Sequence, residues 1–292
     1  MGWKGIFLRA SLGVLALSAA LVVFAGYEYY EVFGGGEEVY ETIPPDLPAM
    51  KPTAILIFTK TNGFRHGDSI AAGTKALVDL ISNRGWSSFV TDNAAVFNQA
   101  QLAKFKAVIC NNTSGNNLLP AQQAAFTQYM TDGGGFVGIH ASGGDPSYKW
   151  RWYVDTLIGA QFKGHPLFPE FQRATLHVED LDHPATRHLG STWVRTDEWY
   201  SFERSPRDHV HVLATLDEHT YSPKFAWKDI SMGRDHPIIW THCIGRGRAF
   251  YSALGHTASS YSEPQFVEML GGAISWAAGL DGPPCPAQAT TQ

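Results

Sequence analysis

Cysteine is scarce in this chain, and the positions of its three residues limit what the thiols can do. Cys110, Cys243 and Cys285 form no Cys-x-x-Cys pair, so a thiolate metal site and a disulfide framework both have little support. The pattern favours buried or unpaired thiols. A bridge between Cys243 and Cys285 stays open, because it would require only that the C-terminal tail fold back.

Several motifs that carry chemistry are also missing. No Lys/Arg-rich run is present and the formal net charge is −5, which argues against a nucleic-acid partner. There is no His-Glu-x-x-His pair and no P-loop, and Gly133-Gly134-Gly135 precedes a predicted strand, as a helix stop does. Residues 138–143 have the outline of a nucleophile elbow, but His140 stands where Ser or Cys would be. A covalent acyl-enzyme mechanism is therefore unsupported.

A long apolar run, in contrast, lies near the N-terminus. Residues Ile6–Tyr27 are almost wholly apolar and approach the roughly 20 that a membrane-spanning helix needs. Lys4 and Arg9 lie at its front and acidic residues follow it, so we expect a cytoplasmic N-terminus and an exported remainder. Two interpretations are open: a single-pass anchor in the inner membrane with a periplasmic domain, or a signal peptide cleaved near Val23-Phe24-Ala25.

The rest of the chain divides by composition. After the anchor or signal peptide (1–30), a linker at 31–52 is marked by Gly34-Gly35-Gly36 and by the prolines at 44–48. One α/β domain is predicted over 53–280, because this length suits a single core. The tail at 281–292 has the composition of a disordered segment.

Alternating elements predict the fold of that domain. Apolar runs at 54–58, 107–110 and 135–140 are typical of strands buried on both faces. Helical patterns at 70–84 and 120–131 lie between them, so the first half indicates a doubly wound, flavodoxin-like parallel sheet. Runs at 171–178, 209–216, 237–243 and 249–254 predict an antiparallel extension of the same sheet, closed by a helix at 264–278.

Histidines follow several of the predicted strands. His66 lies after the first, His140 closes the strand at 135–140, and His256 follows the strand at 249–254. Ligands of open parallel sheets bind beyond the carboxyl ends of the strands, so we expect these three side chains to line a single cleft. His242 closes the run at 237–241 and is a fourth candidate. Imidazole serves there as acid, base or metal ligand.

Other polar and aromatic residues complete the predicted site. Asp197 and Glu198 would point to opposite faces of a strand, so at most one should line a given pocket. Glu198 is the candidate, with Tyr200 near it. Arg65 is a candidate anion binder. In contrast, His209 and His211 are interpreted as structural.

These segments, taken in order, resemble the ThuA-like (trehalose-utilisation) family. The matching segments are Phe64-Arg65-His66, Gly138-Ile139-His140, His165-Pro166, Asp197-Glu198-Trp199-Tyr200, Trp240-Thr241-His242, Gly245-Arg246-Gly247-Arg248 and Leu254-Gly255-His256. The resemblance implies a class I glutamine-amidotransferase-like fold. Amidotransferase activity is not implied, because His140 replaces the cysteine of those relatives. It implies instead a site at His66, His140, Glu198 and His256, and a sugar-like ligand such as a disaccharide or 3-keto-sugar.

Three functional hypotheses follow. The first is an exported sugar-processing hydrolase, lyase or isomerase without a Ser or Cys nucleophile, with Phe64, Arg65, His165, Tyr200 and His242 contacting the substrate. The second is a non-catalytic accessory subunit of a respiratory or photosynthetic membrane complex, anchored in the bilayer and contacting other integral subunits. The third is a site for zinc or a similar divalent ion, formed by the histidines and Glu198.

Overall fold

The computed structural model describes residues 18–19, 22–23 and 38–285. Most of the predicted membrane segment Ile6–Tyr27 and most of the tail therefore lie outside the described residues. Among the residues that are described, no helix combines the length and apolar character needed to cross a bilayer. The predicted linker is described from Glu38 onward.

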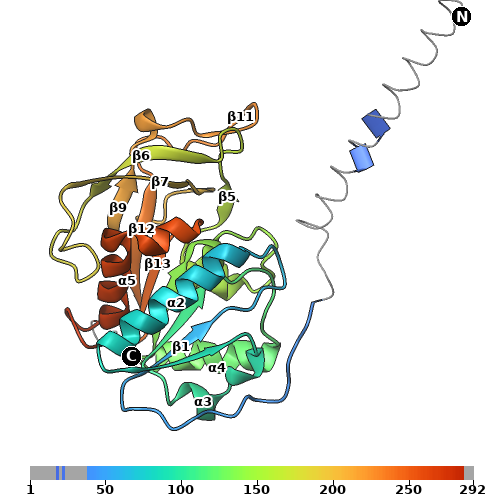
Figure 1. Ribbon diagram of the computed structural model, residues 1–292, viewed down its shortest axis with the longest axis vertical. Helices are drawn as coiled ribbons and strands as arrows, with labels where there is room; N and C mark the ends of the chain where they lie inside the picture. The colour runs from blue at the N-terminus through green and yellow to red at the C-terminus, as the bar shows by residue number, and fades with distance from the viewer. Residues whose placement is uncertain (1–17, 20–21, 24–37, 286–292) are drawn as a thin grey trace, which may run out of the picture.

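In the described part of the chain, nine strands form one sheet in the order β2-β1-β3-β4-β13-β12-β9-β6-β7 (Figure 1). The strands are β1 (Ala54–Phe58), β2 (Ser87–Thr91), β3 (Ala107–Asn111), β4 (Gly135–Ile139), β6 (Phe171–Val178), β7 (Thr192–Glu198), β9 (His211–Leu216), β12 (Pro237–Ile244) and β13 (Gly247–Ser252). Two short pairs stand apart, β5 (Phe162–Gly164) with β8 (Ser201–Phe202) and β10 (Lys224–Phe225) with β11 (Lys228–Asp229).

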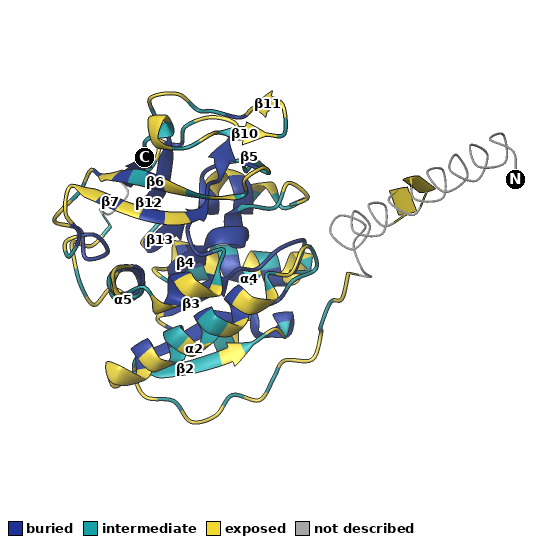
Figure 2. Cartoon of the chain, turned by 45° about the horizontal axis from the view of Figure 1, so that its top comes forward, coloured by how far each residue is buried: buried dark blue, intermediate teal, exposed yellow. Residues whose placement is uncertain are grey.

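The sheet has a parallel half and an antiparallel half. Strands β2, β1, β3, β4 and β13 pair in parallel, and β12, β9, β6 and β7 continue the sheet antiparallel. β1, β3 and β4 are buried along their whole length, whereas β6 and β7 alternate between buried and exposed residues (Figure 2). The predicted mixed sheet, mainly parallel with an antiparallel extension, is confirmed. The continuous apolar runs of the sequence form the strands that are covered on both faces.

Helices cover both faces of the parallel half. They are α2 (Gly67–Asn83), α3 (Gln99–Leu102), α4 (Pro120–Thr131) and α5 (Pro264–Ala277), with short helical turns at Ala94–Val96, His140–Gly143, Tyr153–Ile158, Glu218–Thr220 and Ala258–Ser262. α2 and α5 pack on one face, and α3 and α4 pack on the other (Figure 1). This doubly wound arrangement directs the carboxyl ends of β1, β3, β4 and β13 to one edge.

Strand direction decides which loops reach that edge. β12 runs opposite to β13, so its carboxyl end lies at the other edge of the sheet. β7, after three further reversals, again ends at the edge of the parallel strands. In Figure 1 the strands β6 and β7 run across the direction of β12 and β13. This twist brings the end of β7 back to the loop after β13, where Asp197 accepts a hydrogen bond from Gly255 N at 2.9 Å.

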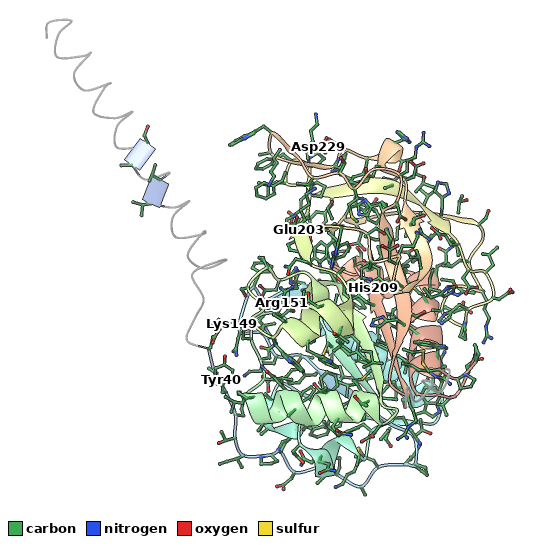
Figure 3. The ribbon with its side chains drawn as sticks, turned by 180° about the vertical axis from the view of Figure 1, so that it is seen from behind. Tyr40, Lys149, Arg151, Glu203, His209 and Asp229 are labelled. Carbon is green, nitrogen blue, oxygen red and sulfur yellow. A yellow bond between two sulfur atoms is a disulfide. The ribbon has the colours of Figure 1, made fainter. Side chains whose placement is uncertain are left out.

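The segment that precedes β1 is bonded to the domain. Glu41 Oε1 lies 2.6 Å from the Nζ of Lys60, whose side chain is only 7% exposed. Glu38 accepts from Tyr40 and also lies near Lys149, and both of these partners are labelled in Figure 3. The part of the predicted linker that is described is therefore attached to the surface of the domain.

The cysteines differ from expectation. Cys243 and Cys285 form a disulfide, although the sequence favoured unpaired thiols. The bridge forms because the chain after α5 turns back along β13, where Arg248 donates to the carbonyls of Trp276 and Asp281. Cys110 is buried and free, and burial raises its pKa to about 12.

Candidate functional site

Four histidines and one carboxylate meet at the carboxyl edge of the sheet. We call His66, His140, His165, His256 and Glu198 the histidine cluster. The ring centroids of His66, His140 and His256 lie 4.6–5.0 Å apart, although 190 residues of chain separate the first from the last. They meet because β1, β4 and β13 are parallel strands of one sheet.

His140 is held in a sharp turn directly after β4. Its φ is +48°, a left-handed conformation that costs about 1–3 kcal/mol for a residue other than glycine. Its Nδ1 donates to the carbonyl of Ala253 at 2.7 Å, so the proton of this nitrogen is directed away from Glu198. The hydroxyl oxygen of Tyr200 lies 2.9 Å from Nε2, and the Tyr200 ring stacks on the imidazole. The side chain is fully buried.

Glu198 is the centre of the cluster. Its Oε2 lies 3.2 Å from His140 Nε2 and 3.1 Å from His256 Nδ1, and its Oε1 lies 3.0 Å from His165 Nδ1. Burial works to raise the pKa of this carboxyl, but hydrogen bonds from the three histidines hold it well below its usual value. Glu198 is therefore an ionised carboxylate that is only 2% exposed.

The pKa values of the imidazoles around Glu198 are shifted in opposite directions. Burial, together with the charges of the neighbouring His140 and His256, lowers the pKa of His66 to about 2. Burial also works against protonation of His165 and His256, but the hydrogen bond and charge of Glu198 outweigh it and raise both pKa values. The Nδ1 of His66 is buried and has no hydrogen-bond partner in the described part of the chain. His66 is thus a neutral imidazole with one unused nitrogen.

His256 is positioned through its backbone. Asp197 accepts from Gly255 N at 2.9 Å and from His256 N at 3.2 Å, while Ser69 at the start of α2 donates to the carbonyl of His256. Asp197 also pairs with Arg195 at 3.0 Å, and both side chains are nearly inaccessible. As the alternation along β7 predicted, Asp197 and Glu198 face different surroundings. Asp197 holds the backbone of Gly255 and His256, whereas Glu198 is itself a member of the cluster.

Of the other predicted residues, Phe64 and Tyr200 contact the cluster, whereas Arg65 does not. Phe64 packs edge-on against His66 with ring centroids 4.7 Å apart, and its side chain is partly exposed. Tyr200 contacts His140 but is itself buried, so it lines the inner side of the cluster. Arg65 is exposed and donates to Thr61, and in the described residues no hydrogen bond or ion pair joins it to the cluster.

His242 does not join the site, which corrects the prediction for this residue. It pairs with Ala249 on β13, three residues before the strand end that leads to the cluster. Its Nε2 donates a hydrogen bond to the carbonyl of Thr156. The titratable group whose charge affects the pKa of His242 is His209, which is not a member of the cluster. The reason is strand direction: β12 runs antiparallel to β13, as the predicted extension requires, so the end of β12 that carries His242 lies at the opposite edge of the sheet from the cluster. His209 bonds the carbonyl of Gly159, a structural role that agrees with its interpretation (Figure 3).

Two residues of the site were missed by the sequence interpretation. Glu170, in the loop after His165, lies against Glu198, and burial followed by the hydrogen bond and charge of that carboxylate raises its pKa. Phe171 packs on His256 with ring centroids 4.9 Å apart. A glutamate in a polar loop carries no distinguishing signal, so only the folded chain identifies it.

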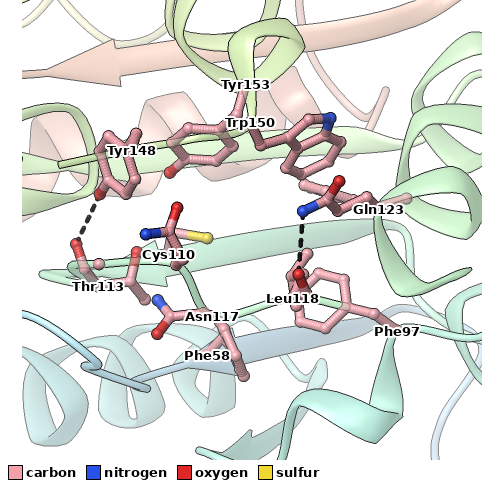
Figure 4. A pocket seen from close by; sticks show the side chains of 13 residues that line it. Phe58, Phe97, Cys110, Thr113, Asn117, Leu118, Gln123, Tyr148, Trp150 and Tyr153 are labelled. Atoms are coloured by element: carbon pink, nitrogen blue, oxygen red, sulfur yellow. Dashed lines mark hydrogen bonds between the residues drawn. The ribbon is translucent and has the colours of Figure 1, made fainter. Parts of the chain in front are cut away.

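The cavity drawn in Figure 4 is separate from the histidine cluster. It lies on the α4 side of the sheet, has a volume of about 40 Å³, and is lined by aromatic rings that include Phe97, Tyr148 and Trp150. Ligand pockets are about 300–1,000 Å³, so it is too small for a sugar. A wider hollow of about 650 Å³ lies near Lys104 and Asp132, at the amino ends of the strands. Neither cavity is lined by a residue of the histidine cluster.

Comparison with known proteins gives a consistent family. Residues 54–277 match the family ThuA, described as trehalose utilisation. A ThuA-like protein from Bacteroides uniformis is 27% identical, with a TM-score of 0.67 over 80% of this chain and 95% of its own. One from Parabacteroides merdae is 20% identical, with a TM-score of 0.61 over 78% and 90%, and shows the shared fold. No protein of curated function matches the sequence.

Proposed function

Since the chain belongs to the ThuA (trehalose-utilisation) family, we propose that its histidine cluster is the reactive centre of a carbohydrate-processing enzyme. The observation that carries the proposal is the convergence of three histidines, His140, His165 and His256, on the ionised carboxylate of Glu198. A buried charge with this many titratable partners is costly for stability, and such groups concentrate at functional sites. The strained backbone of His140 supports the same conclusion.

The reaction class follows from the groups present. Imidazoles that exchange protons near neutral pH suit proton transfer beside a sugar carbonyl, or the addition of water to it. No serine or cysteine stands at the elbow position, which His140 occupies. The proposed activity is therefore hydrolysis, elimination or isomerisation of a disaccharide or an oxidised 3-keto-sugar, without a covalent acyl-enzyme.

The position of the substrate follows from exposure. His140 and Glu198 are buried, whereas the side chains of His165 and His256 are 26% and 18% exposed. Solvent therefore reaches the cluster from the side of these two residues. The partly exposed rings of Phe64 and Phe171 pack on His66 and His256 and offer apolar faces to a sugar ring.

Turnover by point variants tests the proposal. The full-length protein is incubated with trehalose, other disaccharides and their 3-keto forms, and products are followed by mass spectrometry. We expect His140→Ala to reduce turnover by 10²-fold or more, the range for loss of an acid–base group. His242→Ala is the matched control, because this histidine also bonds a backbone carbonyl but lies away from the cluster. Equal turnover by both variants, or none by the wild type on any sugar, would contradict the proposal.

We also propose that the domain works in the periplasm, tethered to the inner membrane. The order of basic, apolar and acidic residues over 4–38 supports this orientation. The Cys243–Cys285 disulfide supports an oxidising compartment, because such bonds are rare in reducing cytosol. Protease added to spheroplasts should digest the domain, and alkaline carbonate should leave it in the membrane. Release by carbonate would indicate a cleaved leader instead.

The alternative function, a non-catalytic accessory subunit of a membrane complex, predicts a different result. If the protein serves a larger respiratory or photosynthetic complex, mild detergent should release it together with other integral subunits in fixed stoichiometry. The apolar run Ile6–Tyr27 motivates this alternative. Native electrophoresis of solubilised membranes decides it, and migration as a free monomer would count against it.

A further inference from the structure

Three donor atoms of the histidine cluster form a nearly equilateral triangle. His140 Nε2 and His256 Nδ1 are 3.1 Å apart, and they lie 3.2 Å and 3.1 Å from Glu198 Oε2. The ligand atom of His66 lies within 4.8 Å of all three. Donors bound at about 2.0–2.2 Å to one ion sit roughly 3.0–3.5 Å from each other in tetrahedral or octahedral geometry. The triangle already has the dimensions of one face of a coordination shell.

From this geometry we propose that His66, His140, His256 and Glu198 bind one divalent first-row transition ion. Mixed nitrogen and carboxylate donors suit zinc, manganese, iron, cobalt or nickel, whereas magnesium and calcium require oxygen ligands. The proposal goes beyond the sugar-processing function, since ion binding needs no substrate. It rests on that function only for the role of the ion, which is to polarise a sugar oxygen that enters a remaining coordination position.

The groups that contact three of the four donors have the arrangement that metal ligands need. Nδ1 of His140 donates to the carbonyl of Ala253, which leaves Nε2 to bind the ion. His165 holds the other oxygen of Glu198 at 3.0 Å, so Oε2 is the oxygen presented to the ion. Asp197 fixes the backbone of His256. Outer contacts of this kind orient the ligands of metal sites and tune their affinity.

The unpartnered nitrogen of His66 is a further observation. A buried polar atom without a hydrogen bond costs about 1–3 kcal/mol, so folded proteins seldom keep one unless another group satisfies it. A cation bound through Nδ1 of His66 would remove this cost, and any cation at the site would neutralise Glu198, which faces Glu170 as well as the histidines. Hydrogen bonds within the cluster alone leave Nδ1 of His66 without a partner in the described part of the chain.

Metal content of the purified protein tests the proposal. The full-length chain carries a tag without histidine, is purified in mild detergent without chelator, and is assayed by elemental mass spectrometry. It is then stripped with chelator and titrated with Zn²⁺, Mn²⁺, Co²⁺ and Mg²⁺ against a competing indicator. We expect one transition ion per chain, no competition by millimolar Mg²⁺, and a visible Co²⁺ absorption band on reconstitution.

Point variants assign the site. Loss of even an outer contact costs about 10–100-fold in affinity, so removing a ligand in His256→Ala or Glu198→Gln should cost roughly 100-fold or more. His242→Ala, the matched histidine at the other edge, should stay within about twofold of wild type. Circular dichroism in excess chelator checks folding, and the partly exposed His256 gives a usable variant if Glu198→Gln fails to fold. Weak binding that is equal in wild type and His256→Ala would overturn the proposal.

Activity assays separate this inference from the proposed function. Stoichiometric binding with no turnover of any sugar would sustain the metal centre and reject the enzyme. Turnover without a stoichiometric transition ion would sustain the enzyme and reject the metal centre, and turnover that is equal in stripped and reconstituted protein would reject the role of the ion in the reaction. Turnover that is lost on stripping and restored by one of the transition ions supports both.

Discussion

Asp197→Ala probes the contact network that joins β7 to the loop carrying His256. The carboxylate accepts from Glu198 N at 2.9 Å and from the backbone of Gly255 and His256, and it pairs with Arg195 at 3.0 Å. Alanine removes every one of these acceptors at once. The residue is fully buried, so water cannot replace the lost oxygens without opening the structure.

The magnitude follows from what stays behind. A buried charge that loses its partner costs about 3–5 kcal/mol, and each orphaned backbone N–H costs about 1–3 kcal/mol. These losses overlap, and Arg195 keeps Glu263 at 3.3 Å and the rings of Trp193 and Phe266. We therefore expect the free energy of unfolding to fall by about 4 kcal/mol. Asp197→Asn keeps one acceptor oxygen and should lose about half as much.

Urea denaturation followed by tryptophan fluorescence measures this loss. The control is Asp229→Ala, at the exposed hairpin of β10 and β11, which should leave the midpoint unchanged (Figure 3). Metal affinity of the folded fraction gives a second measure, because the backbone of His256 loses its support. A loss of less than about 1 kcal/mol in Asp197→Ala would refute the reasoning, since it would mean that these contacts carry no net energy.

Three further predictions concern the rest of the domain. Replacing both Cys243 and Cys285 by Ser should lower stability by up to about 4 kcal/mol, the loop-closure value for their 42-residue separation, and should abolish the effect of reductant on the melting temperature. Burial lowers the pKa of His183 to about 4, so its contribution is complete above pH 6.5 and is lost as pH falls toward 4. His183→Asn should therefore reduce the pH dependence of the free energy of unfolding, measured by urea denaturation, by about 1.4 kcal/mol per pH unit in that window. Glu41→Ala leaves the Lys60 ammonium buried without its partner and should cost about 3 kcal/mol in the same assay, whereas a change below 1 kcal/mol would show that water reaches Lys60.

Local patterns in the sequence were sufficient for the parallel half of the fold. The apolar runs at 54–58, 107–110 and 135–140 could be satisfied only as strands covered on both faces, and they are so placed. The positions of His66 and His140 directly after such strands then imply a shared edge, because all parallel strands end on the same side. His256 obeys the same rule because β13 runs parallel to β4, a pairing that the structure shows, whereas the sequence placed the run at 249–254 in the antiparallel extension.

The antiparallel half depended on the folded chain. An apolar run has the same pattern whether its strand points up or down, so periodicity could not show which strand of the predicted antiparallel extension ends at the edge of His66 and His140, and the location of His242 could not be predicted. The pairing of Cys243 with Cys285 likewise depends on where the chain after α5 turns, which is a property of packing.

The sequence by itself determined the strands, the helices between them and the histidines at their ends, because these follow from local burial and from a repeat of two or 3.6 residues. Only the tertiary structure decided which groups face the carboxylate of Glu198. The twist that brings β7 back to β13 sets the contacts of Asp197, Glu198 and Glu170 with segments far away in the chain. Such contacts are matters of distance and direction in space, and they leave no periodic mark on the sequence.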